Sequence, residues 1–173
     1  MQRVMIVGGS GSGKSTLARF LGQQTGLPVR HMDQIQWLPG WVSRPRSERI
    51  EMAHAVERGA AWIFEGNFSS TVEHRAARAD TLVWLDLPVG LRLWRVTWRL
   101  LRYYGQERPD MAVGCTEGIH GETWPFYRWI WNTRQTHRVR FQNLIAGHPH
   151  LDVHHLTSRA EVAGFMRNVS ETS

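Results

Sequence analysis

The chain has 173 residues, of which 42% are hydrophobic, and this suffices for one globular domain with an ordinary core. Charge interrupts every apolar run well before the roughly 18 residues of a membrane span, and the N-terminus enters a strand directly. We therefore expect a cytoplasmic protein without a signal peptide. The formal charge of +6 suits phosphate-bearing ligands, from small nucleotides to nucleic acid, and a lone Cys115 excludes an internal disulfide.

A complete phosphate-binding loop lies near the start of the chain. Residues 8–15 read Gly-Gly-Ser-Gly-Ser-Gly-Lys-Ser, which matches the pattern G-x-x-x-x-G-K-[ST]. The loop follows an apolar run at 3–7, typical of a buried strand, and precedes apolar residues at helical spacing at 15–21. A flexible Gly/Ser linker would lack both neighbours, so the segment is interpreted as a nucleotide site.

Each residue type in this loop suits a nucleotide phosphate. Lys14 is the only lysine beside twenty arginines, and its compact ammonium fits a tight loop better than the wide arginine fork. Backbone N–H groups and the following helix N-terminus favour the anion, and the Ser15 hydroxyl is a Mg²⁺ ligand. The predicted nucleotide-binding residues are Gly8, Gly9, Ser10, Gly11, Ser12, Gly13, Lys14, Ser15 and Thr16.

Strand and helix patterns alternate along the rest of the chain. Further strands are expected at residues 27–32, 60–64, 81–85 and 151–156. Helices are expected at about 47–58, from Pro88 to about 103, at 124–146, and after a capping box formed by Ser158 and Glu161. This alternation predicts an α/β fold with a five-stranded parallel sheet.

Acidic residues follow three of these strands. Asp33, Glu65 and Asp86 each stand at the carboxyl end of a predicted strand. In open parallel sheets ligands bind beyond these ends. Each acid is therefore placed to meet the nucleotide, its metal or an acceptor.

The helix after Pro88 carries a basic stripe. Arg92, Arg95, Arg99 and Arg102 recur at spacings of three, four and three, so they share one face of the helix. The stripe could present charge to a cleft, or it could be an ordinary solvated face.

Several motifs together resemble a known family. Besides the glycine loop they are Gly-Leu-Pro-Val-x-His-Met-Asp at 26–33, Trp-Ile-x-Glu-Gly-Asn at 62–67, Arg-Ala-Asp-Thr-Leu-Val-x-Leu-Asp-Leu-Pro at 78–88 and Arg-Pro-Asp at 108–110. Over nearly its full length the chain resembles small P-loop kinases of the adenylate-kinase type. More narrowly, it is similar to the adenylate-kinase-like family labelled DNA topology modulation proteins. The resemblance implies one three-layer P-loop NTPase domain over 1–173, with an acceptor-binding insert at about 33–60 and a short lid at about 104–122.

The resemblance also implies roles for residues outside the glycine loop. Glu65 corresponds to an acid that holds Mg²⁺, directly or through water, and Arg95 and Arg99 correspond to arginines that contact phosphates. The expected lid contains four glycines, and Arg108 is its candidate for binding ATP. Arg134 and Arg138, four residues apart on the next helix, are candidates for the transferred phosphoryl group.

The acceptor site is the least defined part of this interpretation. In small-molecule kinases of related fold, an aspartate at the position of Asp33 receives the proton of the acceptor hydroxyl, although Asp33 could instead be a turn or cap residue. The residues expected to border the acceptor are Trp37, Trp41, Arg44, Asn67 and Arg75. A metal cluster at His148, His150, His154 and His155 is not expected, because neighbouring residues of a strand point to opposite faces.

Three functional hypotheses follow from the sequence. The favoured one is a kinase, monomeric or homodimeric, that uses ATP and Mg²⁺ to phosphorylate a nucleotide or a small hydroxylated metabolite. The second is a nucleotide-dependent regulator that binds DNA, which the net charge and the family label favour, but no nucleic-acid-binding module is evident. The third is a kinase-like fold that binds ATP and transfers phosphoryl groups poorly.

Overall fold

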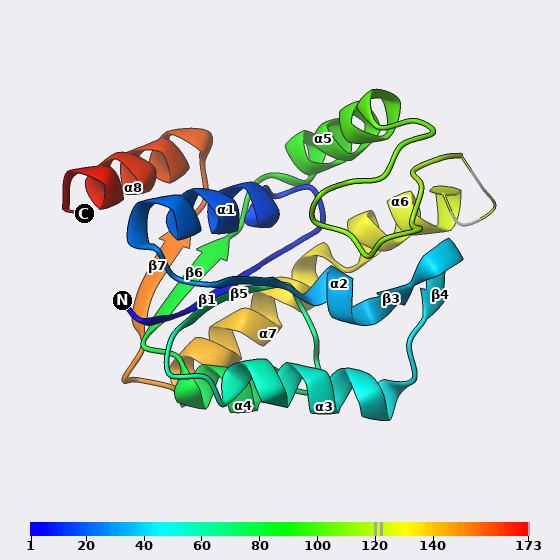
Figure 1. Cartoon of the computed structure of the whole chain (residues 1–173). Helices are drawn as coiled ribbons and strands as arrows, with labels where there is room; N and C mark the ends of the chain where they lie inside the picture. The colour runs from blue at the N-terminus through cyan, green and yellow to red at the C-terminus, as the bar shows by residue number, and fades with distance from the viewer. Residues whose placement is uncertain (120, 122, 173) are drawn as a thin grey trace.

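A five-stranded parallel sheet forms the centre of the molecule (Figure 1). The computed structural model describes residues 1–119, 121 and 123–172. The strands are β1 (Arg3–Gly8), β2 (Val29–His31), β5 (Trp62–Glu65), β6 (Thr81–Leu85) and β7 (Asp152–Leu156), in the order β2-β5-β1-β6-β7. Every neighbouring pair is parallel, so the α/β class and the five-stranded parallel sheet are confirmed.

Helices cover both faces of the sheet and give three layers. The helices α1 (Lys14–Thr25) and α8 (Arg159–Thr172) pack on one face, and α3 (Arg46–Glu57), α4 (Val72–Arg78) and α7 (Arg134–Gly147) pack on the other (Figure 1). Side chains alternate along β1. Val4 and Ile6 enter the core under α1 and α8, while Met5 and Val7 enter the core on the opposite face. The central strand β1 therefore buries both of its faces, as expected inside a parallel sheet.

The remaining elements lie beyond the carboxyl edge of the sheet. They are α2 (Met32–Gln36), the two-stranded antiparallel sheet of β3 (Trp37–Leu38) and β4 (Val42–Ser43), the 3₁₀ helix Pro39–Trp41 between these strands, α5 (Val89–Arg102) and α6 (Thr123–Asn132). Among the described residues, no helix has the length and apolar character needed to cross a membrane.

The segments expected as insert and lid touch each other. The Gly40 N–H donates to Gly114 O at 2.8 Å, and Trp41 Nε1 donates to Thr116 O at 2.8 Å. Cys115 is buried at this junction, with its thiol 3.4 Å from Leu38 O. Residues 120 and 122 of the expected lid lie outside the described residues.

Several expected boundaries were wrong. The helix expected at 124–146 is two helices, α6 and α7, separated at Thr133. The expected strand at 27–32 is only three residues long, and Asp33 lies in the first turn of α2 rather than at the strand end. The helix after the glycine loop continues through Gly22, where a side chain would collide with Val29, and ends at Gly26 in a left-handed conformation.

Candidate functional site

The glycine loop connects β1 to α1 in a conformation that its glycines make possible. Gly8, Gly11 and Gly13 have φ angles of 145°, 77° and 97°, which residues with a side chain rarely adopt. A Cβ at Gly8 would lie 2.4 Å from Leu85 O, so the loop leaves no room for one. The Ser12 N–H closes the turn on Gly9 O at 3.1 Å. The loop thus turns directly into the N-terminus of α1, where anions bind.

Lys14 lies over this loop at the first position of α1. Its Nζ donates to Gly9 O at 3.2 Å. Burial lowers the pKa of Lys14, whereas the negative charges of Glu65 and Asp33 act to raise it. An anionic phosphate bound at the loop would act in the same direction as these carboxylates and favour the charged form of Lys14. Thr16, also expected to bind nucleotide, is exposed in the first turn of α1.

Ser15, Glu65 and Asp110 form an oxygen-rich group beside the loop. Ser15 Oγ donates to Glu65 Oε1 at 3.0 Å, and the same hydroxyl is near enough to Asp110 to act to lower the pKa of that carboxyl. Glu65 is nearly fully buried at the end of β5, and His31 Nδ1 lies 2.7 Å from the same Oε1. Hydroxyl and carboxylate oxygens are the donors that Mg²⁺ prefers, so these residues fit the predicted metal site.

Asp33 faces the same space from α2. The pKa of Asp33 is raised because surrounding protein displaces water and Glu65 adds negative charge, although Lys14, Arg108 and Arg99 act to lower it. Residue Asp33 as a whole is exposed on α2. A carboxylate with a raised pKa is a better proton acceptor than an ordinary aspartate.

Two arginines of α5 contact the glycine loop. Arg92 is buried, and its Nε donates to Ser10 O at 3.1 Å, while Arg95 donates to Ser12 O at 3.1 Å. Burial lowers the pKa of both side chains. These two arginines therefore hold the backbone of the glycine loop at Ser10 and Ser12. Arg102, at the end of the stripe, is exposed near the Tyr103 ring.

The segment after α5 brings a second charged group to the site. Arg108 is buried between two acids, with its Nε 2.6 Å from Glu117 Oε1 and its NH1 3.3 Å from Asp110 Oδ2. Arg99 lies 3.8 Å from the same Glu117 oxygen. Burial acts to raise the pKa of Asp110, but Arg108, the Ser15 hydroxyl and Arg19 outweigh it and lower the pKa. Asp110 therefore joins this segment to the glycine loop.

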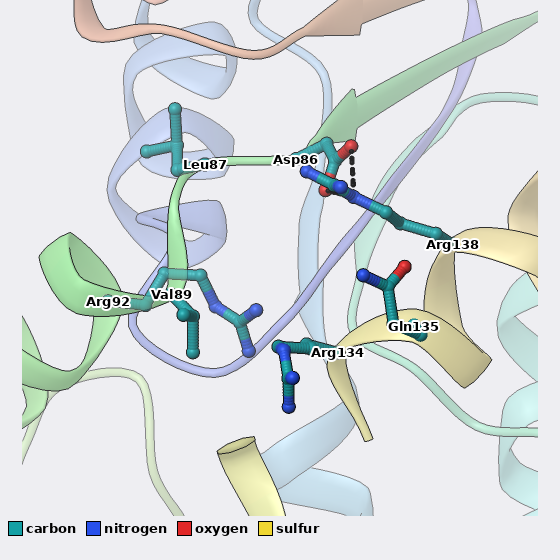
Figure 2. Close-up of a pocket in the computed structure, with 7 residues that line it drawn as sticks. All are labelled: Asp86, Leu87, Val89, Arg92, Arg134, Gln135 and Arg138. Carbon is teal, nitrogen blue, oxygen red and sulfur yellow. Dashed lines mark hydrogen bonds and ion pairs between the residues drawn. The ribbon is translucent and has the colours of Figure 1, made fainter. Parts of the chain in front are cut away.

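Arg134 and Arg138 border a pocket on another side of the loop. The pocket, of about 190 Å³, lies between α5 and α7, and its lining includes Arg92 and Asp86. Figure 2 shows Arg92 and Arg134 reaching toward the same space, with Arg138 paired to Asp86. The Arg138 Nε to Asp86 Oδ2 distance is 2.9 Å. Three arginines against one carboxylate leave the pocket with net positive charge, which suits an anion.

The residues expected around an acceptor are divided by the structure. Trp37 and Trp41 lie together, edge to face with ring centroids 5.6 Å apart. Arg44 donates to Ile35 O at 2.9 Å and pairs with Glu48, while Arg75 is fully buried. Asn67 contacts the glycine loop itself: its Nδ2 donates to Gly8 O at 2.7 Å and its Oδ1 accepts from the Gly8 N–H at 3.2 Å.

Two residues of the site were not predicted from the sequence. His31, which holds Glu65, is two positions before Asp33 at the end of the same strand, and that placement was the available signal. Asp110 belongs to a motif used for the family resemblance, but nothing in its local pattern indicated a contact with Ser15 across 95 residues of chain. The histidines of β7 are separated, because His155 stacks on Trp84 and His154 lies against Phe165.

The sheet order and the loop after β1 define a P-loop NTPase fold of the kinase type. Searches of protein-family models and of curated proteins gave no match. Among solved structures, a shikimate kinase from Bacteroides thetaiotaomicron is similar, with a TM-score of 0.59, 16% identity, and coverage of 99% of this chain and 97% of that one. A shikimate kinase from Acinetobacter baumannii in complex with shikimate has a TM-score of 0.57 at 16% identity, covering 99% and 92%. A sugar kinase from Janibacter sp. HTCC2649 has a TM-score of 0.51 at 14% identity, covering 99% and 91%. At these identities the likeness establishes the fold.

Proposed function

We propose that this protein is a kinase that transfers the γ-phosphoryl group of Mg-ATP to a small hydroxylated metabolite, or to a nucleotide. The observation that carries the proposal is the glycine loop, where Lys14 Nζ donates to Gly9 O and Ser15 Oγ donates to Glu65 Oε1. Asp33 is near enough for its charge to act on Lys14. The names of the similar structures, shikimate and sugar kinases, support an acceptor with a hydroxyl group.

The site provides the components that phosphoryl transfer requires. The loop N–H groups and Lys14 bind the phosphates, and Arg99 and Arg108 neutralise charge on the transferred group. Asp33 accepts the proton of the acceptor hydroxyl as the oxygen attacks the γ-phosphorus, and the bond from that phosphorus to the β–γ bridging oxygen breaks, so that ADP leaves. Ser15, Glu65 and Asp110 would hold Mg²⁺, which supplies charge neutralisation across the β- and γ-phosphates.

Arg134 and Arg138, which line the pocket between α5 and α7, would bind a phosphate group of one of the substrates. A phosphate-bearing end of either substrate would neutralise the excess positive charge of this pocket. Arg92 both lines the pocket and contacts Ser10 O, so an anion there would lie beside the glycine loop.

A DNA-associated regulator of the topology modulation family is the second candidate. The observation that favours it is the stacked and exposed pair Trp94 and Trp98 on α5, with ring centroids 6.3 Å apart. Exposed aromatic rings beside arginines bind the bases of single-stranded nucleic acid. With a net charge of +6, this surface supports a salt-dependent interaction with a polynucleotide.

The two candidates are separated by ADP formation from Mg-ATP. The acceptor panel contains nucleoside monophosphates, nucleosides, sugars and hydroxylated carboxylic acids, with duplex and single-stranded DNA as separate additions. We expect one small acceptor to stimulate turnover strongly and the Lys14→Ala variant to lose that stimulation. Stimulation by DNA alone would favour the regulator.

A further inference from the structure

A compact group of imidazole and carboxylate side chains lies between α3 and α4, apart from the glycine loop. His54 Nδ1 and His74 Nδ1 are 2.8 Å and 2.6 Å from the same oxygen, Glu57 Oε2, and 3.1 Å from each other. The two rings cross edge to face with centroids 4.4 Å apart. Three potential ligand atoms from two helices therefore converge on one point.

The three atoms cannot converge in this way without a proton or a cation between them. Two unprotonated imidazole nitrogens at 3.1 Å direct their lone pairs at each other and at a carboxylate oxygen, which is repulsive. Either protons or a cation must lie among the three atoms. Glu57 is fully buried, so its negative charge lacks the compensation that water would provide.

The surroundings of Glu57 leave one of its oxygens for such a cation. Arg75 Nε donates to Glu57 Oε1 at 3.3 Å, and the backbone oxygen of Glu57 accepts a hydrogen bond from Arg78. These contacts hold the carboxylate so that Oε2 faces the two histidines. Contacts of this kind orient ligands in metal sites.

We propose that His54, Glu57 and His74 bind a divalent transition-metal ion of the Zn²⁺ class and so connect α3 to α4. Two imidazoles and one carboxylate form a donor set that Zn²⁺ uses with water as the fourth ligand. His54 and His74 are partly exposed, with side-chain exposures of 28% and 46%, which leaves a side open for the ion and its water. Imidazole ligands favour Zn²⁺, Ni²⁺ or Cu²⁺ over Mg²⁺.

The distances need only a small adjustment to hold the ion. Ligand bonds of about 2.0–2.2 Å place tetrahedral donor atoms about 3.3 Å apart. The observed separations of 2.6, 2.8 and 3.1 Å would have to widen by about 0.7, 0.5 and 0.2 Å respectively. Rotation of the two partly exposed histidine side chains can provide this while Glu57 stays fixed. The positive charge of Arg75 opposes the ion, and water at the open side screens that repulsion.

Titration with Co²⁺, a spectroscopic substitute for Zn²⁺, tests this site. The wild-type chain is held in excess Mg²⁺, which occupies oxygen-only sites. We expect one Co²⁺ per chain, the visible absorption of tetrahedral Co²⁺, and its loss when Zn²⁺ displaces the ion. His54→Ala and His74→Gln should each weaken binding by at least ~10-fold, and His150→Ala, an exposed histidine elsewhere, should not.

Thermal unfolding provides a second readout and checks that the variants fold. Zn²⁺ should raise the Tm of the wild-type chain and of His150→Ala, but not that of His74→Gln, whose Tm without metal should match the wild type. No tetrahedral absorption, equal affinity in His54→Ala and His74→Gln, or a Zn²⁺-induced rise in Tm that survives in His74→Gln would each overturn the proposal. None of these measurements depends on kinase activity.

Discussion

Replacing Asn67 with alanine tests which part of the site this side chain serves. The amide makes two hydrogen bonds with the backbone of Gly8, at 2.7 Å and 3.2 Å, and Gly8 is buried where the chain enters the loop. The Asn67→Ala variant leaves an N–H and a carbonyl without these partners, which costs about 1–3 kcal/mol. Because ~1.4 kcal/mol is tenfold in an equilibrium constant, a cost borne wholly by the nucleotide complex would raise the Kd of Mg-ATP by about 5- to 140-fold.

The cost divides between folding and binding, so both are measured. Calorimetric titration with a non-hydrolysable ATP analogue gives the Kd, and urea unfolding gives the free energy of unfolding. Asn143→Ala, at an exposed position of α7, is the matched control and should change neither. A Kd and an unfolding free energy that both stay at wild-type values would refute the idea that Asn67 supports the glycine loop through Gly8. A higher KM for the acceptor with an unchanged Kd for ATP would instead support the acceptor contact predicted from sequence.

The remaining predictions concern three carboxylates. Asp33→Asn should lower kcat by about 10²- to 10⁴-fold while calorimetry shows Mg-ATP binding retained; an unchanged kcat would remove Asp33 from the mechanism. Because the pKa of Asp33 is raised, kcat/KM of the wild type should fall on acidification at a pH above the ordinary carboxyl value of about 3.9, and a fall only near that value would contradict the assignment. Glu65→Gln should raise the Mg²⁺ concentration needed for half-maximal turnover, and an unaltered Mg²⁺ titration would exclude Glu65 as a ligand. Asp80 accepts hydrogen bonds from the Thr81 hydroxyl and from the backbone N–H groups of Arg3 and Gln2. Together these outweigh burial and lower its pKa, so Asp80→Ala should reduce the free energy of unfolding at pH 7 by about 1–2 kcal/mol. This stabilisation is present above the unfolded-state pKa near 3.9 and is lost as pH falls through the folded-state pKa, so a difference in urea unfolding that persists at the lowest pH would count against it.

Local sequence patterns were sufficient to predict the parallel sheet and the phosphate-binding loop. Strands such as Thr81–Leu85 are short apolar runs buried on both faces, and the glycines of the loop adopt backbone angles that require glycine. Both signals depend only on residues close together in the sequence, so they can be recognised without knowledge of the fold. The break at Thr133 was missed because the polar run at 132–138 contains no glycine or proline to mark a helix end. The short helix α4 was missed because its seven residues hold little periodic signal.

The roles of individual side chains depend on distant partners and were harder to predict. Asn67 and Arg75 were expected to border the acceptor; in the structure Asn67 contacts Gly8 and Arg75 is buried against Glu57. Arg92 was expected on a stripe that could be solvated, and it is buried on Ser10 because α5 crosses the loop. Such contacts join residues tens of positions apart, and only the tertiary packing selects them.

The most direct test of the central claim follows the γ-phosphorus of ATP by ³¹P NMR, with Mg²⁺ and the acceptor that stimulates turnover most. The account predicts that the γ-phosphorus signal of ATP is replaced by that of a phosphorylated acceptor, in an amount equal to the ADP formed. Release of inorganic phosphate alone, or an unchanged ATP spectrum with every acceptor of the panel, would contradict it.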